Sequence, residues 1–430
     1  MAHHSNRQGF ARLVDRLNRF PQGAPPSELL NKILAMLFSE EEAGLVSVLP
    51  IKPFTAQKAA RIWKMRLSQT KKILDRLASR AILVDMECND QTYYVLPPPM
   101  AGFFEFSMMR VRRDLNQKVL SELFFQYLNV EEDFIRDLFT HGDTQVGRVF
   151  VHEPVLTNEN AVHVLDYEKA SHVIRTASAM GVSTCYCRHK MSHIGKACRA
   201  PQEICMTFNM AASSLIRHGH ARAVDVKEGL ALLDQAYEAN LVQFGENVQR
   251  GVNFICNCCK CCCEAMIAAR KFAFLNPIHT SGFMPRLDAQ SCIGCGRCVT
   301  ICPVEAISMV SADDPHQPKR KTVRINPEIC LGCGICVRNC AQGALELVSL
   351  GKRVITPLNG THKAVVMAVE RGKLQNLIFD NQVLFSHRAL AAVLGVILRL
   401  PPIKQVLAGK QVKSRYLATL GGWLNPAESE

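Results

Sequence analysis

The chain has 430 residues, of which 48% are hydrophobic and 21% charged, with 19 cysteines and a formal net charge of +13. This length predicts several domains, and the composition is that of a globular chain rather than a disordered one. No apolar run is long enough to cross a bilayer and the first residues lack the apolar core of a signal peptide, so we expect a cytoplasmic protein.

The first hundred residues predict an arm followed by a small domain. Residues 1–27 are polar, end in a proline-rich stretch and indicate a flexible arm. Helical periodicity starts after Ser27, at Thr55 and after Ser68, and two short strands follow around an Asn-Asp turn. Three helices followed by a hairpin resemble a winged helix-turn-helix domain, which we place at residues 28–100.

The rest of the chain falls into four segments. We expect a helical connector at 101–145, a cysteine-rich α+β domain at 146–285, a doubled cysteine motif at 286–349 and a helical region at 350–430. Within the last segment, the apolar stretches 366–379 and 389–402 are expected to be core.

The positive charge is concentrated in two places. Residues 51–80 carry nine Lys or Arg against one acid, and residues 361–420 carry nine against two. A localised basic surface predicts an acidic partner, which can be nucleic acid, an anionic lipid surface or an acidic protein. In a DNA reader the third helix of the winged-helix-like domain would enter the major groove, whereas in a docking module the same basic face would meet a protein. We favour docking.

The cysteines predict metal sites rather than disulfides. Most of them lie one to three residues apart, in a long chain without a visible export signal. Thiols crowded in this way are typical of metal ligands in a reducing compartment.

The strongest motif occurs twice. CIGCGRCVTICP at 292–303 and CLGCGICVRNCA at 330–341 share the spacing C-x-x-C-x-x-C-x-x-x-C. Three close thiolates suit three corners of one cubane, and the fourth cysteine is directed to another cluster. This segment resembles the bacterial two-cluster ferredoxins. A pair of zinc sites is the alternative, but zinc ordinarily takes two C-x-x-C pairs per ion.

The resemblance implies two 4Fe–4S clusters and their ligands. One cluster would be held by Cys292, Cys295, Cys298 and Cys340, and the other by Cys330, Cys333, Cys336 and Cys302. The segment between the repeats, DDPHQPKRKTVRI, is expected to form a hairpin. The predicted fold class is therefore a multi-domain α+β protein with a helical and winged-helix N-terminal part, a cysteine-rich middle, a ferredoxin-like domain and a helical tail.

Two further groups of cysteines lie in the middle segment. The first consists of Cys185, Cys187, Cys198 and Cys205, which suffice for one additional iron–sulfur cluster or one zinc ion. His189 and His193 could replace a ligand there, and Arg188 and Lys196 would offset the negative charge of bound thiolates.

The second group is the run CNCCKCCC, which contains Cys256, Cys258, Cys259, Cys261, Cys262 and Cys263. Neighbouring side chains diverge, so these six thiols cannot all face one metal. A subset could join ligands from elsewhere, form a redox-active dithiol or bridge two metals. Cys88 stands alone on a predicted strand and is expected to be a buried small side chain.

These motifs predict an iron–sulfur electron-transfer protein that relays electrons through two 4Fe–4S clusters to redox partner proteins, within or towards a larger oxidoreductase. The wider pattern over about 150–420 resembles uncharacterised bacterial ferredoxin-domain proteins. No glycine-rich nucleotide or phosphate loop is visible, which favours a relay over a self-contained enzyme. The alternatives are a redox- or iron-responsive DNA-binding regulator, and a catalytic oxidoreductase that uses the middle cysteines.

Overall fold

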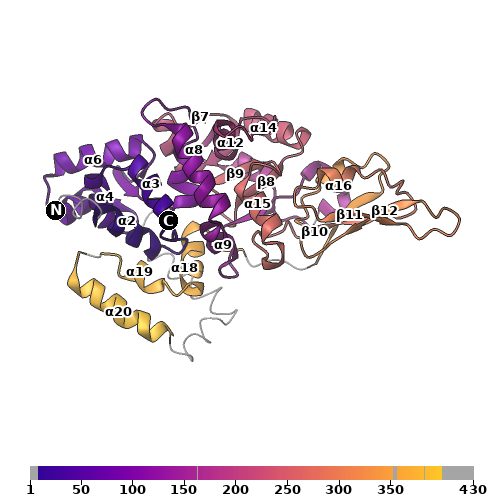
Figure 1. The fold of residues 1–430 in the computed structure, drawn as a ribbon. Coiled ribbons are helices and arrows are strands. Elements are labelled where there is room, and N and C mark those ends of the chain that lie inside the picture. The colour runs from indigo at the N-terminus through magenta and orange to yellow at the C-terminus, as the bar shows by residue number, and fades with distance from the viewer. Residues whose placement is uncertain (1–7, 162, 352–355, 382, 400–430) are drawn as a thin grey trace. The chain divides into compact units, whose positions relative to one another are not determined.

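The computed structural model describes residues 8–161, 163–351, 356–381 and 383–399. The chain divides into two compact units: unit 1 contains 1–144, 210–222 and 357–430, and unit 2 contains 145–209 and 223–356. Helices and strands occur in both, which confirms the predicted mixture of helix and sheet (Figure 1).

The described part of unit 1 begins with five helices. They are α2 (Gln8–Arg19), α3 (Glu28–Leu37), α4 (Glu40–Ser47), α5 (Ala56–Trp63) and α6 (Leu67–Ser79). Ser27, Ser39 and Thr55 cap α3, α4 and α5, because each side chain accepts a hydrogen bond from the backbone N–H three residues later. The Ser39 cap is a reciprocal box, since the Glu42 carboxylate accepts from the Ser39 N–H at 3.0 Å.

Helix α2 differs from the expected flexible arm. Leu13 and Leu17 are buried, so the helix has an apolar face that packs into the unit. The buried Arg16 donates to two backbone carbonyls of the segment after α4, at 2.6 and 2.9 Å. Together these contacts hold the helix to the domain.

A small antiparallel sheet completes the first hundred residues. Its strands are β1 (Phe54–Thr55), β2 (Val84–Cys88) and β3 (Gln91–Val95), in the order β1-β3-β2. Phe54 pairs with Tyr94, and Val84 pairs with Val95. The order along the described part of the first hundred residues is therefore three helices, a short strand, two helices and a hairpin.

The remaining helices of unit 1 come from three separate stretches of sequence. They are η1 (Pro99–Phe103), α7 (Phe104–Phe106), α8 (Gln117–Phe125), η2 (Gln126–Val130), α9 (Asp133–Thr140), α13 (Asn209–Arg217), α18 (Gly360–Glu370), α19 (Leu374–Ile378) and α20 (Phe385–Arg399). Arg371, which follows α18, donates to the carbonyls of Asp137 and Leu138 on α9 at 3.1 and 3.2 Å. The expected connector and the C-terminal helices thus belong to one folded unit.

Asp85 on β2 connects the 210–222 insertion to the hairpin. Its carboxylate accepts hydrogen bonds from Ser214 at 2.5 Å, Arg217 at 2.7 Å and His218 at 3.1 Å. Burial would raise the pKa of Asp85, but these donors outweigh burial and hold that pKa below its usual value.

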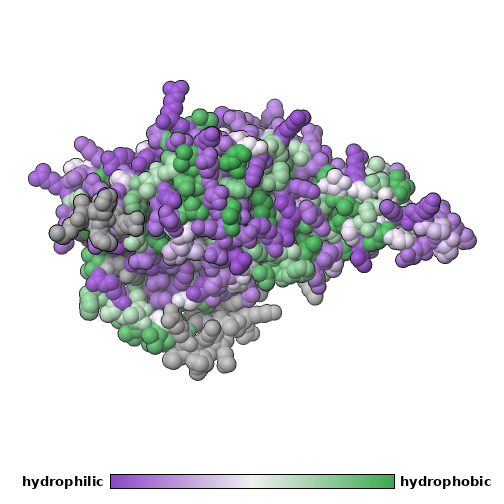
Figure 2. Space-filling model, viewed as in Figure 1, coloured by the Kyte–Doolittle hydropathy of each residue, from purple (hydrophilic) through white to green (hydrophobic). Residues whose placement is uncertain are grey.

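Helix α20 is more exposed than the sequence indicated. Phe385, Val393 and Val396 are 76%, 59% and 64% exposed, and apolar side chains gather along this helix in Figure 2. The described part of 389–402 is therefore largely a surface helix rather than core, and 400–402 lie outside the described residues. By contrast, Val365 and Ala368 on α18 are fully buried.

Unit 2 contains a six-stranded sheet. Its strands are β4 (Gly147–Val149), β5 (Met180–Thr184), β6 (Glu203–Phe208), β7 (Arg222–Ala223), β8 (Val242–Glu246) and β9 (Phe254–Cys258), in the order β4-β8-β9-β6-β5-β7. The helical segments are η3 (Glu153–Val155), α10 (Asn158–Ala161), η4 (Asp166–Glu168), α11 (Ala170–Thr176), α12 (Tyr186–His193), α14 (Val226–Glu238), α15 (Glu264–Lys271) and η5 (Ala273–Leu275). Val173 on α11 and Leu233 on α14 share a core with Met206 and Ile255 of the sheet.

The doubled motif forms its own pair of ribbons. Its elements are β10 (Phe283–Leu287), α16 (Arg297–Ile301), β11 (Ile307–Ser311), β12 (Lys321–Ile325), α17 (Ile335–Arg338) and β13 (Leu345–Ser349). Strand β10 pairs with β13 in antiparallel orientation. Strand β11 pairs with β12, also antiparallel, and these two strands lie side by side in Figure 1. Residues 312–320 connect β11 to β12, so the segment between the repeats contributes to a hairpin, as predicted.

Candidate metal centres

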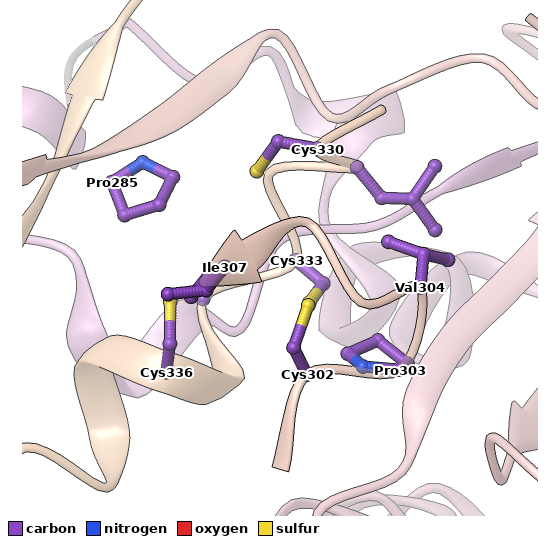
Figure 3. Close-up of a pocket in the computed structure, with 10 residues that line it drawn as sticks. Pro285, Cys302, Pro303, Val304, Ile307, Cys330, Cys333 and Cys336 are labelled. Carbon is purple, nitrogen blue, oxygen red and sulfur yellow. The ribbon is translucent and has the colours of Figure 1, made fainter. Parts of the chain in front are cut away.

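Four cysteines from the two repeats face one pocket. They are Cys302 from the first repeat and Cys330, Cys333 and Cys336 from the second (Figure 3). The pocket is partly open to solvent. Its other walls come from Pro285, Pro303, Val304, Ile307, Leu331 and Gly334. The pocket therefore combines four thiols with mainly apolar walls.

The backbone around the pocket is shaped for thiolate ligands. Gly332 and Gly334 have φ values of 66° and 87°, a conformation that favours glycine, and α17 begins directly after Gly334. The Ala306 N–H donates to the Cys302 sulfur at 3.3 Å. Such N–H···S bonds stabilise a thiolate and are one of the means by which a protein sets a cluster's reduction potential.

Burial controls the protonation of these thiols. It raises the pKa of Cys330 to about 11 and also raises those of Cys333 and Cys336, and the nearby Cys302 adds to each increase. The thiols therefore keep their protons at neutral pH until a metal displaces them. Four gathered thiols, an amide donor and apolar walls fit a 4Fe–4S cluster.

The other cysteines of the first repeat differ in exposure, since Cys292 is buried and Cys298 is half-buried. Burial raises the pKa of Cys298, and the neighbouring thiols of Cys295 and Cys292 raise it further. Cys295 is exposed, and the adjacent Ile293 is 64% exposed. Cys340 follows α17 at the end of the second repeat, and its membership of this group stays a prediction.

The sheet of unit 2 brings distant cysteines together. On β6 and β9, Met206 pairs with Ile255, so the next step of this register sets Cys205 beside Cys256. Cys258 lies two residues further along β9 and therefore on the same face as Cys256. Cys185 follows directly after β5, whose Ser183 pairs with Cys205.

Six of the middle cysteines form a closed ring of sulfur contacts, which we call the six-thiol ring. In order around the ring they are Cys185, Cys187, Cys263, Cys258, Cys256 and Cys205. Each thiol interacts with its two neighbours, and the Cys263 and Cys258 sulfurs are 3.1 Å apart. The ring is buried or half-buried throughout.

Contacts between neighbouring thiols shift their pKa values alternately down and up around the ring. Contacts with the Cys187 and Cys258 thiols lower the pKa of Cys263 to about 6. Corresponding contacts lower the pKa of Cys185 and Cys256. The same contacts raise the pKa of the three remaining thiols. Neighbouring thiols of the ring thus have pKa values shifted in opposite directions.

Four other cysteines form a compact group, which we call the four-thiol site. Cys198, Cys259, Cys261 and Cys262 place their sulfurs within 4.8 Å of one another. A tetrahedral zinc ion with Zn–S bonds of about 2.3 Å holds its sulfurs roughly 3.8 Å apart, so this group is close to the size of a single-ion site. A hydrogen bond from Cys262 lowers the pKa of Cys259 to about 4.

The structure groups the middle cysteines differently from the sequence-based expectation. Cys198 was expected with Cys185, Cys187 and Cys205, but its thiol lies with three members of the 256–263 run. That run is divided, because Cys258 and Cys263 face the ring whereas Cys259 and Cys262, their neighbours in sequence, face the four-thiol site. The ring depends on strand register, which spacing alone does not reveal.

Charged side chains are buried beside these thiols. Arg188 is fully buried, its Nη1 donates to the Asn257 carbonyl at 3.1 Å, and no ion pair with a carboxylate is seen for it within the described residues. Burial lowers the pKa of Arg188, but the Cys185, Cys205 and Cys259 thiols more than offset this and hold it above its usual value. Arg188 thus faces both cysteine groups.

A buried ion pair joins the helices that carry ring cysteines. Lys190 on α12 pairs with Glu264 at the start of α15, and both side chains are almost inaccessible to solvent. Cys187 lies on α12, and Cys263 is the N-cap of α15. His189 and His193 contact each other, with their Nε2 atoms 3.2 Å apart, and neither belongs to the four-thiol site.

The four-thiol site adjoins the doubled motif. Lys260, between two of its cysteines, donates to the Thr300 carbonyl at 3.4 Å and pairs with Glu305 at 3.9 Å. Arg270 donates to the Pro303 carbonyl at 3.1 Å. The loop that bears the four-thiol site therefore contacts the segment around Cys302.

Comparison with known proteins identifies the doubled motif. The 4Fe-4S dicluster domain family matches residues 291–344, within the segment 286–349 predicted from sequence. This confirms an iron–sulfur, ferredoxin-like domain in that part of the chain. No curated protein and no solved structure matches the chain. Among the described residues, no helix has the length and apolar character required to cross a membrane.

Proposed function

We propose that this protein transfers electrons through two 4Fe–4S clusters held by the ferredoxin-like domain. The observation that carries the proposal is the position of Cys302, a residue of the first repeat that faces the same pocket as three cysteines of the second. In two-cluster ferredoxins the fourth cysteine of one motif binds the other cluster, and this position matches that exchange.

The chain's own residues would hold and tune the clusters. Cys302, Cys330, Cys333 and Cys336 would bind one, and Cys292, Cys295, Cys298 and Cys340 the other. When bound, such clusters supply one-electron transfer. Val304 and Ile307 keep water away from the buried group, and the Ala306 N–H stabilises the Cys302 thiolate.

The difference in exposure between the two cysteine groups indicates where electrons would enter or leave the domain. Exposed Cys295 and Ile293 offer a surface to a redox partner protein, whereas Cys333 and Cys336 are buried. The segment around Cys302 in turn contacts the loop of the four-thiol site. We infer a relay that runs between a partner at the exposed group and the cysteine-rich part of unit 2, in the service of a larger oxidoreductase.

The proposal is tested on anaerobically purified full chain. We expect at least eight irons per chain with matching acid-labile sulfide, and an EPR spectrum of two interacting clusters after reduction. Stopped-flow mixing of the reduced chain with a one-electron acceptor should reoxidise both clusters. Zinc in place of iron, or reduced clusters that no one-electron acceptor reoxidises, would refute electron transfer as the function.

A DNA-binding regulator remains a second candidate because of the basic helices α5 and α6. From α4 onward, the order helix, strand, two helices and hairpin (α4, β1, α5, α6, β2, β3) supports the winged-helix interpretation. Arg76 and Arg80 pair with the buried Glu42 at 3.2 and 2.8 Å, so these two side chains have a structural role. Within 51–80, the exposed basic residues that form no ion pair with any described residue are Arg61, Lys64, Arg66, Lys71 and Lys72. We favour docking to an acidic protein for this surface.

The two candidates differ in how DNA binding responds to salt and sequence. About five phosphate contacts would give a salt slope near −4.5, a loss of several hundredfold between roughly 50 and 200 mM salt. We expect weak binding, equal for unrelated duplexes in fluorescence anisotropy and independent of cluster oxidation state. Lys71→Ala/Lys72→Ala should weaken it further, and Lys227→Ala on α14 is the control. A preferred sequence bound tightly at physiological salt would establish the regulator instead.

A further inference from the structure

The four-thiol site lies outside the residues that would hold the two ferredoxin clusters. It consists of Cys198, Cys259, Cys261 and Cys262. We propose that it binds one zinc ion through its four thiolates, and that this ion fixes the loop 259–262 against the ferredoxin-like domain. The inference goes beyond electron transfer, because it assigns a second kind of metal to residues outside the dicluster match at 291–344.

The distances between the sulfurs fit a single ion. All four sulfurs lie within 4.8 Å of one another, and those of Cys261 and Cys262 are 3.6 Å apart. Four thiolates around a tetrahedral zinc ion, with Zn–S bonds of about 2.3 Å, are roughly 3.8 Å apart. A 4Fe–4S cubane binds each thiolate through a different iron and therefore needs a wider spacing. The site thus has the size of one ion rather than that of a cluster.

Two loops that are distant in sequence supply the thiols. Cys198 lies in the loop after α12, and the other three lie between β9 and α15. The Cys262 sulfur is 4.0 Å from the Lys196 carbonyl oxygen, so the two loops are in contact. Side chains of adjacent residues ordinarily diverge, but the turn at 260–262 brings the sulfurs of Cys261 and Cys262 together. An ion bound by all four thiolates would tie the two loops to each other.

A buried cation would balance the charge of the occupied site. Four thiolates around one divalent ion leave a net negative charge. Arg188 is fully buried, and its Nε and Nη2 atoms have no hydrogen-bond partner among the described residues. The Cys259 thiol is one of the groups that its guanidinium faces. A buried cation without an anionic partner is costly, and metal-bound thiolate at Cys259 supplies that partner.

The ligand set favours zinc over ferrous iron. Zn²⁺ binds a given set of ligands more tightly than Fe²⁺ does. Cys259 and Cys262 have the C-x-x-C spacing that is typical of structural zinc sites, and such sites are closed by four protein ligands. Four thiolates leave no position for water or substrate, so the ion would stabilise structure and take no part in catalysis.

The ion would fix the loop that contacts the ferredoxin-like domain. Lys260, between two of the ligands, donates to the Thr300 carbonyl at 3.4 Å. Arg270 donates to the Lys260 carbonyl and, at 3.1 Å, to the Pro303 carbonyl. These contacts lie on both sides of Cys302 in the sequence. Loss of the zinc ion should therefore loosen the packing beside Cys302 without removing any ligand of the ferredoxin clusters.

The test measures zinc, iron and acid-labile sulfide in the anaerobically purified full chain, expressed with both metals available. We expect one zinc per chain, with four sulfur neighbours at about 2.3 Å in zinc-edge X-ray absorption. Cys259→Ser/Cys262→Ser should lose the zinc and keep the iron, with a lower melting temperature because metal binding contributes to folding. Cys88→Ser, outside the site, is the control and should keep the zinc.

A single variant locates the zinc without disturbing the core. Cys261 is exposed, so Cys261→Ser leaves the packing intact. We expect one of its four zinc–sulfur neighbours to be replaced by a lighter atom at a shorter distance. This measurement and that on the wild type keep the test valid if the double variant does not fold.

Three results would overturn the proposal. They are a wild-type chain that takes up no zinc, four unchanged sulfur neighbours in Cys261→Ser, and a folded double variant that keeps its zinc or loses iron instead. The iron content and EPR spectrum of the wild-type chain report separately on the proposed relay, because no ligand of the ferredoxin clusters belongs to the four-thiol site.

Discussion

Replacing Cys333 and Cys336 with serine should remove about four irons from the full chain and convert the EPR spectrum of two interacting clusters into that of one isolated cluster. Both thiols line the pocket that they share with Cys302 and Cys330, so the change removes half of one ligand set. Serine is nearly isosteric, and the apolar walls of the pocket remain. The loss therefore reports on ligation rather than on packing.

The matched experiment uses the first repeat. Cys292→Ser/Cys295→Ser should also remove about four irons, and the signal that remains should be that of the buried cluster. Because Cys295 is exposed and Cys333 is not, we expect the variant that keeps the buried cluster to react more slowly with a protein acceptor. Retention of all iron in either variant would contradict the ligand assignment.

The ferredoxin-like segment was predictable because its information is local. Each repeat places its thiols within eleven residues, and the glycines that its turns require lie inside the same motif. The assignment of Cys302 to the cluster of the second repeat depends on residues far away in the sequence. That assignment was inferred from the resemblance to two-cluster ferredoxins. The structure places Cys302 against the second repeat, in agreement with that resemblance.

The middle cysteines show where sequence spacing stops being informative. Cys205 and Cys256 are some fifty residues apart and become neighbours through the pairing of β6 with β9. A shift of one residue in that register would turn Cys256 and Cys258 to the other face of the sheet. The alternation in FICNC, with Cys256 and Cys258 on one face and Asn257 on the other, is the signal in the sequence that could have separated the two groups.

Helix α2 was missed for a different reason, because its residues were predicted to belong to a flexible arm. Its apolar residues are few and lie among charged ones, so composition outweighed the helical spacing of Leu13 and Leu17. What fixes the helix is tertiary contact, including the hydrogen bonds of buried Arg16 to carbonyls beyond α4. A single-sequence pattern does not contain that partner.

Replacing Gly332 with alanine should abolish the buried cluster even though every ligand remains. A β-carbon at this position would lie 2.0 Å from the Phe283 carbonyl oxygen, which belongs to strand β10 and has little freedom to move because β10 pairs with β13. We expect loss of about four irons and a lower melting temperature in differential scanning calorimetry of the full chain.

Gly343→Ala separates this clash from the cost of the backbone conformation. Gly343 has a φ of 63°, close to the 66° of Gly332, but a β-carbon there meets no atom within 4 Å. Both variants therefore pay the left-handed penalty of roughly 1–2 kcal/mol for a residue with a side chain, and Gly332→Ala alone forces β10 away from the cysteine loop. Equal iron content in the two variants would mean that the loop tolerates the displacement and that the thiols alone determine cluster binding. Iron loss confined to Gly332→Ala would show that close backbone packing between β10 and the second repeat is as necessary for the cluster as its four cysteines.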